Sequence, residues 1–426
     1  TKLKINIFFI QMSSIKNIIF YFPHKKIGGV STLFLNASEI LQKKFDIHIV
    51  DFNDGYMKNN LPNGVNFIDV ENIDKYPIDS IVIFQSFRFW NIRDFEKFDS
   101  RTKIIFWNLH PDNLYPYIFS NKSTSFKSII ANLIKPLSFF RQKKIGNLIT
   151  YLNKNGGIFF MDEENYLKTC SYFKTININE NYLPVITKKN ILVKKSNSDL
   201  NNFAWIGRIC DFKVHILIHL LQRLNTIYAL NYKKLNFYIV GDGEEMPLLK
   251  KEVLTLKNLN IEFLGEVDKD MENKIFSKNI DILFAMGMSA LEGASRSIPT
   301  VLLDYSYKKI KNKYRFNLAF NSKKYTLAKE IKASNFEKVC TLNNLLMTIK
   351  NDYLSISNKS YLWWLHNYSG ESFEKKINNI FKKNSTSFED LKDQKFNKVD
   401  LISFYLKNIS KKLISEPKYE SHFNQY

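Results

Sequence analysis

The stretch 281–304 constrains the fold of this chain more than any other part of the sequence. It reads as a buried strand, a turn that contains Gly287 and Ser289, a helix start that carries Glu292, and a second buried strand after Pro299. A helix that begins after such a turn offers free backbone N–H groups and the positive end of its dipole to an anion. A carboxylate further along can accept ribose hydroxyls, as in dinucleotide-binding folds. The stretch therefore predicts a nucleotide-diphosphate site.

Short apolar runs alternate with amphipathic segments on both sides of residues 188–202, which are polar, lysine-rich and typical of an inter-domain linker. The first set predicts strands at 17–22, 46–52, 65–70, 80–85, 103–108 and 157–161, and a helix at 32–44. The second set predicts strands at 203–206, 236–240 and 261–264, and helices at 214–224, 246–256 and 271–277. Strands that alternate with helices in this way predict an α/β fold of doubly wound parallel sheets.

The chain has 426 residues, which exceeds the size at which single hydrophobic cores usually split. We expect one Rossmann-like domain over 12–190 and a second over 200–365. A helical, basic C-terminal extension is expected over 366–426. Residues 1–11 precede Met12, a natural start, and are interpreted as a tag, an upstream translated stretch or the end of a preceding module.

Composition narrows the class of partner and the compartment. The formal net charge of +21 favours anionic partners, although a coding bias towards lysine, asparagine, isoleucine and phenylalanine accounts for about half of it in our weighting. The three cysteines, Cys170, Cys210 and Cys340, form no close pair and no metal-ligand spacing, which indicates a reducing compartment without structural disulfides. No apolar run approaches 18 residues, so no membrane-spanning helix is expected.

The segment 203–213 is a strand followed by Gly207 and two cations, Arg208 and Lys213. Gly207 lets the backbone pass close to a ligand. Arginine can bind a diphosphate through two parallel hydrogen bonds and lysine binds it as a point charge. The alternative is a solvated loop with two ordinary surface cations. The nearby turn of 287–292 favours the diphosphate interpretation.

The turn Gly241-Asp242-Gly243 follows another predicted strand and precedes a helix. It lies where ligands bind in open α/β sheets, at the carboxyl end of a parallel strand. We expect backbone contact with the nucleotide base. A tight turn without a ligand is an equally good interpretation.

Two further candidates follow strands of the first domain. Gly28 and Gly29 form a glycine loop that would approach the donor phosphates if the strands of the two domains face each other, although a simple turn is the alternative. His110 follows a predicted strand at 103–108 and is expected to act as a proton shuttle or to bind a sugar hydroxyl, because histidine titrates near neutrality. A histidine satisfied within a polar turn is the alternative.

Glu292 lies among apolar residues of a predicted helix, and a buried carboxylate without a partner is costly. Binding ribose is the best reason for its position. The backbone groups of Gly287, Met288, Ser289 and Ala290 are expected to contact the donor as well. Arg296 and Asp304 are interpreted as structural.

Several motifs are absent from the sequence. There is no phosphate-binding Gly-x4-Gly-Lys-Ser/Thr loop, no Gly-x-Gly-x-x-Gly, no His-Glu-x2-His and no Gly-x-Ser-x-Gly. No Asp-x-Asp suggests a metal held on a diphosphate. We therefore expect no metal and no cofactor. Two cations and a helix N-terminus would neutralise the diphosphate instead.

The motifs Gly207-Arg208…Lys213, Val240-Gly-Asp-Gly-Glu-Glu, Phe263-Leu-Gly-Glu266 and Ser289-x2-Glu292-Gly-Ala…Pro299 occur in an order and spacing that resemble GT-B glycosyltransferases of the bacterial family 4 type. The resemblance is strongest over 200–310. It implies two Rossmann-like domains that face a cleft, an acceptor domain over 12–190 and a nucleotide-sugar domain over 200–365. It also implies that Arg208 and Lys213 contact the diphosphate, Glu292 the ribose, Gly29 the phosphates, and His110 the region of the transferred sugar.

One departure from the family pattern concerns the sugar. The family usually carries a glutamate eight positions before the ribose-binding one, and Phe284 occupies that position here. The donor sugar and the retaining or inverting outcome are therefore open, and main-chain groups of 286–290 are expected to substitute.

The resemblance implies a metal-independent, hexosyltransferase-type enzyme of bacterial surface polysaccharide synthesis, for capsule or lipopolysaccharide. It would take a UDP- or GDP-type nucleotide sugar and a glycan or lipid-linked acceptor, with no nucleic-acid partner. We expect a cytoplasmic protein, with the basic segment 121–153 and the C-terminal lysines as one option for contact with an anionic membrane surface and a solvated basic face as the other. A nucleotide-sugar epimerase and a catalytically degenerate scaffold that binds anionic partners are the alternative functions.

Overall fold

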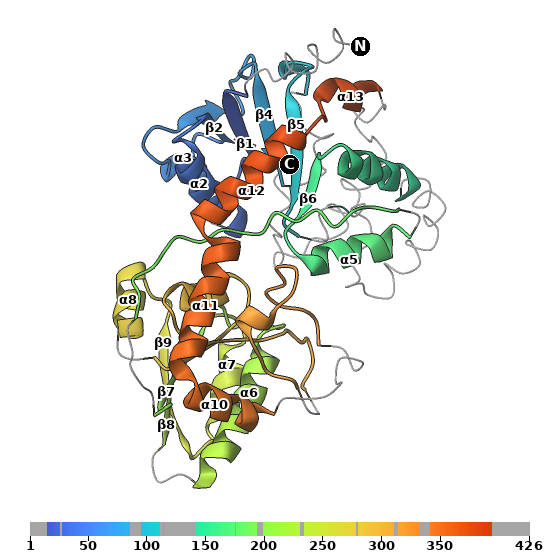
Figure 1. Ribbon diagram of the computed structural model, residues 1–426. Coiled ribbons are helices and arrows are strands. Elements are labelled where there is room, and N and C mark those ends of the chain that lie inside the picture. Colours follow the sequence, from blue (N-terminus) through green and yellow to red (C-terminus); the bar gives the residue numbers. More distant parts are fainter. Residues whose placement is uncertain are drawn as a thin grey trace, which may run out of the picture. The chain divides into compact units, whose positions relative to one another are not determined.

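The computed structural model describes residues 15–25, 28–85, 95–110, 114, 142–174, 176–193, 199–230, 234–277, 280–310, 314–331 and 341–393. The chain folds into two compact units (Figure 1). Unit 1 comprises Thr1–Pro184 together with Phe373–Tyr426, and unit 2 comprises Val185–Ser372. The boundary after Pro184 lies close to the expected domain limit at 190. The expected extension over 366–426, however, is not a separate body, since the chain rejoins unit 1 at Phe373.

Unit 1 is built on a six-stranded parallel sheet in the order β3-β2-β1-β4-β5-β6. Its core strands are continuous apolar runs because helices cover parallel sheets on both faces, and Ile18, Ile19 and Phe20 are fully buried. Its strands are β1 (Asn17–Tyr21), β2 (Asp46–Asp51), β3 (Asn66–Asp69), β4 (Ser80–Phe84), β5 (Lys103–Asn108) and β6 (Ile158–Phe160). Its helices include α2 (Gly29–Leu41), α3 (Tyr56–Asn59) and α5 (Glu163–Tyr172).

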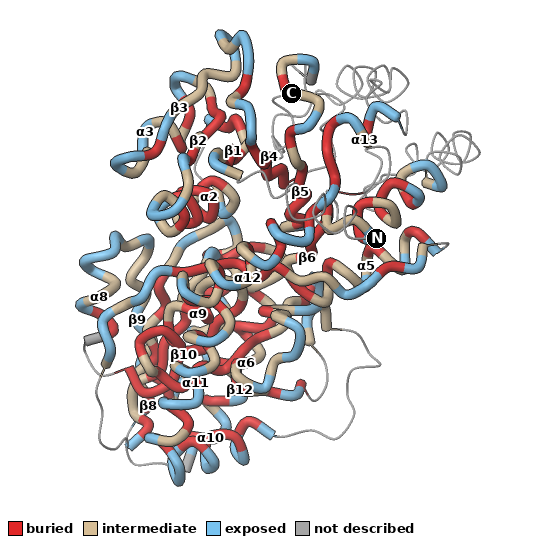
Figure 2. Tube along the Cα trace, turned by 45° about the horizontal axis from the view of Figure 1, so that its top comes forward, coloured by how far each residue is buried: buried red, intermediate tan, exposed pale blue. Residues whose placement is uncertain are grey.

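Unit 2 has a six-stranded sheet in the order β12-β11-β10-β7-β8-β9, in which only the pairing of β11 with β12 is antiparallel among the described strands. Figure 2 shows buried residues along β10 in this unit and along β4 and β5 in unit 1. The strands are β7 (Asn202–Ile206), β8 (Leu235–Val240), β9 (Leu259–Gly265), β10 (Ile282–Ala285), β11 (Thr300–Leu302) and β12 (Asn317–Leu318). The helices are α6 (Val214–Ile227), α7 (Met246–Val253), α8 (Lys269–Ser277), α9 (Met288–Ser295), α10 (Leu342–Asn351) and α11 (Tyr353–Tyr368).

Both sheets have the Rossmann strand order, so the order reverses between β1 and β4 in unit 1 and between β7 and β10 in unit 2. Ligands of open α/β sheets bind outside the carboxyl ends of the strands at this reversal. The doubly wound α/β fold expected from the sequence is therefore confirmed, and in unit 2 the loops after β7 and β10 are the places to look for a ligand site.

The chain returns to unit 1 through α12 (Gly370–Lys383) and α13 (Phe388–Asp393). Phe373 stacks on Trp107 at 5.6 Å, and Phe388 stacks on Phe98 at 4.6 Å between ring centroids. Between the two helices, Asn384 Nδ2 donates to the carbonyl oxygen of Ile104 at 2.8 Å. These contacts make residues 373–393 part of the core of unit 1.

The basic segment 121–153 falls mostly outside the described residues, and residues 142–153 within it are helical. The part of the C-terminal extension after Asp393 also lies outside them. Of the helices in the described part of the chain, none combines the length and the apolar character needed to cross a membrane.

Asp162 caps the N-terminus of α5 from a buried position. Its Oδ1 accepts hydrogen bonds from the backbone N–H of Asn165 at 2.9 Å and from Asn165 Nδ2 at 2.8 Å. Burial raises the pKa of Asp162 above the usual 3.8, although the two hydrogen bonds oppose that shift. The raised pKa means that the folded state binds a proton more tightly than the unfolded state does. The carboxyl therefore contributes its full stabilisation of the fold below pH 3.8. This stabilisation is lost as the pH rises through the pKa of the folded state.

Replacing Asp162 by asparagine is expected to keep the cap, because asparagine and aspartate cap helices equally well. The change should remove the decline of stability with pH that this carboxyl causes. The free energy of unfolding, measured by urea denaturation between pH 4 and pH 7, should therefore fall less steeply with pH in Asp162→Asn than in the wild type. A variant with the wild-type slope would show that Asp162 does not titrate in the folded protein over this range.

Candidate functional site

Three loops of unit 2 follow neighbouring strands at the carboxyl edge of the sheet. They are residues 207–213 after β7, 241–245 after β8, and 286–287 after β10. All three lead directly into the N-termini of helices, α6, α7 and α9. The topology therefore gathers most of the residues that the sequence singled out as donor-binding into one region of unit 2.

The loops after β7 and β8 are joined by close backbone contact. The backbone N–H of Ile209 donates to the carbonyl oxygen of Asp242 at 2.9 Å, and that of Gly207 donates to Val240 at 3.0 Å. A Cβ on Gly241 would lie 2.3 Å from the Gly207 carbonyl oxygen, and one on Gly243 would lie 2.2 Å from that of Ile209. Packing between the loops therefore accounts for both glycines, and contact between this turn and a nucleotide base stays a prediction.

Replacing Gly241 by alanine is expected to lower the free energy of unfolding by about 3 kcal/mol, because the residue has a φ of +122° and the new Cβ would overlap the neighbouring loop. The matched control is Gly29→Ala in unit 1, where a Cβ would meet no atom within 4 Å. Urea denaturation should show a change within about 0.5 kcal/mol for that control. Equal effects of the two substitutions would contradict the packing argument.

Arg208 and Lys213 lie on the same loop and in different environments. The Arg208 side chain is 70% exposed, and its Nη2 is 3.0 Å from Glu244 Oε2. Lys213 is more buried and occupies the N-cap position of α6, with its Nζ 3.6 Å from the position that a Cβ on Gly207 would take. Burial lowers the pKa of Lys213; proximity to Cys210 opposes the shift, and the positive charge of Arg208 adds to it.

Lys213 forms no ion pair with any carboxylate of the described residues. A mostly buried ammonium without a counter-ion is unfavourable unless a ligand supplies the negative charge. It stands beside the N-terminus of α6, which also favours an anion. The arrangement is suited to a phosphate group.

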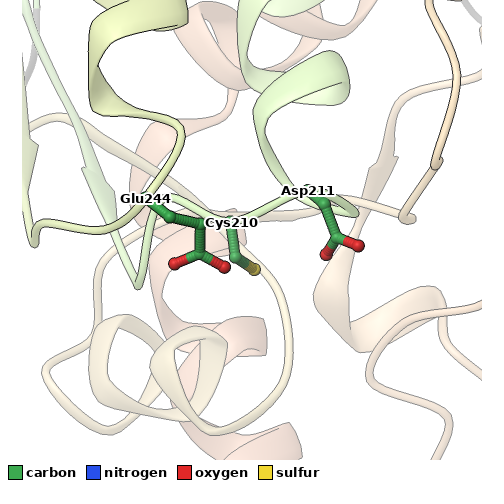
Figure 3. Close-up of side chains that lie close together, drawn as sticks. All are labelled: Cys210, Asp211 and Glu244. Atoms are coloured by element: carbon green, nitrogen blue, oxygen red, sulfur yellow. The ribbon is translucent and has the colours of Figure 1, made fainter. Parts of the chain in front are cut away.

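Cys210 and Asp211 of this loop and Glu244 of the loop after β8 are the one group of three potential metal ligands among the described residues, with ligand atoms within 4.8 Å of one another (Figure 3). Their chemistry does not fit a metal site. Glu244 already pairs with Arg208. Burial raises the pKa of the Cys210 thiol, which disfavours the thiolate that a metal needs.

The loop after β10 ends in a helix N-terminus without a side-chain cap. Gly287 is the N-cap of α9 with a φ of +62°, and no acidic residue lies in the first turn. The backbone N–H of Gly287 donates to Leu327 at 2.9 Å and that of Ala290 to Gly287 at 3.1 Å, whereas those of Met288 and Ser289 donate to no described residue. The two amides and the helix dipole offer a second position for an anion.

Glu292 lies one turn further along α9. Its Oε2 is 2.7 Å from Arg296 Nη1 and 2.8 Å from Lys269 Nζ, and it accepts a hydrogen bond from Asn190 Nδ2 at 2.8 Å. Its Oε1 accepts no hydrogen bond from a described residue. Burial alone would raise the pKa of Glu292, but Lys269 and Arg296 hold it below its usual value, so the carboxylate is charged and has one oxygen left to accept a hydroxyl.

Phe284, at the position of the missing family glutamate, is fully buried within β10. Only Met286 and Gly287 separate β10 from α9. The short connection has no room for a loop that would carry a second glutamate. The polar groups of 286–290 are those of its backbone and the hydroxyl of Ser289.

Gly28, Gly29 and His110 lie at the carboxyl edge of the sheet in unit 1. Gly28 is the N-cap of α2 in an extended conformation, with a φ of −160°, and Gly29 is the first helical residue. Neither glycine is required by backbone conformation or by contact with a neighbour, since a Cβ on either would meet no atom within 4 Å. His110 is exposed and follows β5 by two residues.

Sequence reasoning missed Asn190 and Lys269, which contact Glu292. Lys269 is the first residue of α8, the helix after β9, and this position in the sequence is only a weak indication of a ligand site. Asn190 lies in the segment interpreted as a linker, and nothing in its surroundings in the sequence points to a site. Arg296, for which the sequence indicates a structural role, is 1% exposed and paired with both Glu272 and Glu292.

No protein-family model and no curated protein matches this sequence. Solved structures do match it over most of their length. TarM is 12% identical with a TM-score of 0.56, covering 87% of this chain and 99% of that one. A glycosyltransferase from Rickettsia africae ESF-5 is 12% identical with a TM-score of 0.54, covering 88% and 100%. HepE from Anabaena in complex with UDP-glucose is 11% identical with a TM-score of 0.52, covering 86% and 99%.

At these identities the likeness concerns the fold. The matched proteins are GT-B glycosyltransferases. The matches include both units of this chain and almost the full length of each matched protein. The chain therefore has the two-domain α/β fold of the GT-B glycosyltransferases.

Proposed function

We propose that the chain is a glycosyltransferase that moves a sugar from a nucleotide-diphosphate donor to a hydroxyl of a glycan or lipid-linked acceptor. The observation that carries the proposal is that unit 2 holds two incomplete groups. The mostly buried ammonium of Lys213 pairs with no carboxylate of the described residues, and the charged carboxylate of Glu292 keeps one oxygen that accepts no hydrogen bond from them. Lys213 is the N-cap of α6 and Glu292 lies on α9, the helices that follow the two strands at the reversal of sheet order. A diphosphate and a ribose hydroxyl would complete them.

The residues that contact the donor in this proposal take separate roles. Lys213 and Arg208 stabilise the departing diphosphate, and the amides of Met288 and Ser289 add hydrogen bonds. Glu292 accepts a ribose hydroxyl. Preorganised donors aimed at developing charge contribute more to catalysis than flexible ones, because they need no reorganisation during the reaction. His110 in unit 1 is the candidate contact for the transferred sugar, and Gly28 and Gly29 leave space for the phosphates.

Contact of Arg208 with the diphosphate would compete with its ion pair to Glu244. The pair is solvent-exposed, and exposed ion pairs contribute only about 0–1 kcal/mol. Breaking this ion pair therefore costs little free energy.

The donor proposed is of the UDP or GDP type, which is supported by the UDP-glucose complex of HepE. The finer assignment is a metal-independent, hexosyltransferase-type enzyme of bacterial surface polysaccharide synthesis, peripheral at the cytoplasmic face of the membrane.

The test is release of nucleoside diphosphate from a panel of UDP- and GDP-sugars, with and without a mixture of glycan and lipid-linked acceptors. Acceptor-dependent release from one donor, lost in Glu292→Ala, is the expected result. Turnover of a donor without any acceptor would favour an epimerase. No response to any nucleotide sugar, together with steeply salt-dependent binding of an oligonucleotide, would favour a scaffold that binds anions.

A further inference from the structure

The carboxylate proposed to bind ribose is held by a network of charges that the family motif does not contain. Arg296, 1% exposed, donates from Nη1 to Glu292 and from Nη2 to Glu272 Oε1 at 2.8 Å. Lys269 bridges the same two carboxylates, at 3.0 Å from Glu272 Oε1 and 2.8 Å from Glu292 Oε2. Two cations and two carboxylates thus form a charge-balanced group.

Asn190 is the fifth member and comes from the segment that connects the two units in the sequence. Its Nδ2 donates to Glu292 Oε2 and to Ser295 Oγ, both at 2.8 Å. The segment is itself fixed to unit 2, since the backbone N–H of Thr187 donates to Tyr368 at 3.1 Å and that of Val193 donates to Arg296 at 2.9 Å. Asn190 is therefore held in place at the carboxylate.

All three contacts with Glu292 go to the same oxygen atom. A carboxylate oxygen has two lone pairs, so the ammonium, the guanidinium and the amide together saturate Oε2. Oε1 accepts nothing from the described residues. The side chain is fixed on three sides and leaves one oxygen for an incoming hydroxyl.

We infer that Asn190, Lys269 and Arg296 are positioning residues of the ribose subsite, which act by occupying Glu292 Oε2 so that Oε1 is the atom that accepts the ribose hydroxyl. The inference rests on the proposed function and extends it to residues outside the recognised motifs. Asn190 thereby makes the connecting segment part of the donor site.

The experiment is a calorimetric titration with UDP, GDP and their 2′,3′-dideoxy analogues, which lack the ribose hydroxyls. The proteins are the wild type, Asn190→Ala, Lys269→Met and the control Lys189→Ala, which removes an exposed neighbour of Asn190. Asn190 and Lys269 are partly exposed, so these variants are expected to fold, and circular dichroism checks that they do.

The wild type is expected to bind one of the two nucleotides about tenfold or more tightly than its dideoxy analogue, since a hydrogen bond to a charged group is worth that factor. In Asn190→Ala and Lys269→Met this preference should shrink towards one, because Glu292 is no longer fixed, while binding of the dideoxy analogue should change little. Lys189→Ala should keep the wild-type preference. A merely structural role would weaken both ligands alike.

The experiment distinguishes failure of the positioning inference from failure of the proposed function. If the wild type prefers the ribonucleotide and both variants keep that preference, or lose affinity for both ligands equally, the positioning inference is overturned and the proposed function stands. If the wild type binds neither UDP nor GDP, the proposed function is overturned, and the inference with it.

Discussion

Replacing Arg296 by methionine is expected to lower the free energy of unfolding of unit 2 by about 3–5 kcal/mol, because two partly buried carboxylates, Glu272 and Glu292, would then share the single cation Lys269. The guanidinium is 1% exposed and hydrogen-bonds to Glu292, Glu272 and Asn273. It also lies 4.4 Å from the ring centroid of Phe276. Methionine fills the volume of the arginine stem, so the effect measures the lost charge rather than a cavity.

Urea denaturation, followed by a probe in unit 2, checks this expectation. The matched control is Arg101→Met in unit 1, where the arginine is 75% exposed and pairs with Asp99 at 3.2 Å. An exposed pair should contribute less than about 1 kcal/mol. If the two substitutions cost the same, Arg296 is not the centre of the network that the geometry indicates.

Replacing Lys213 by alanine is expected to lower kcat by about 10²–10³-fold, which is the usual cost of removing one preorganised group that stabilises developing charge. Among the described residues no carboxylate pairs with this ammonium, and it is held beside Gly207 at the N-terminus of α6. Stability should not fall in parallel, because removing a mostly buried and uncompensated charge relieves a desolvation cost.

The measurement is steady-state kinetics with the donor identified by the panel above, beside the midpoint of urea denaturation. Lys257→Ala is the matched control, since it removes the same charge from an exposed position of unit 2. The control should retain wild-type turnover. A Lys213→Ala enzyme with undiminished kcat would show that the ammonium does not act on the diphosphate.

Much of the architecture could be predicted because it depends on local periodicity. The strand at 103–108 matches β5 at both ends, and the helix predicted to start at Val214 does so. Buried parallel strands appear as short apolar runs, and these are easy to detect. The predicted boundaries differ from the observed ones where residues typical of turns are part of a helix. Gly29, for example, begins α2 three residues before the predicted start.

The site was predicted less completely because several of its contacts join segments that are distant in the sequence. Asn190 is 102 residues from Glu292, and Lys269 reaches it from another helix. The pairing of Arg208 with Glu244 and the need for glycine at 241 arise from packing between two loops. No pattern along the chain encodes such contacts. The return of Phe373–Asp393 to unit 1 was missed for the same reason.

The central claim is that unit 2 binds a nucleoside diphosphate through Lys213 and Glu292. A calorimetric titration of the wild-type protein with UDP, GDP, ADP and NAD tests it most directly, with Lys213→Ala and Glu292→Ala beside it. We expect the wild type to bind UDP or GDP alone, and each substitution to weaken that binding about tenfold or more. Absence of binding to every nucleotide by the folded protein, or equal affinity in all three proteins, would contradict it.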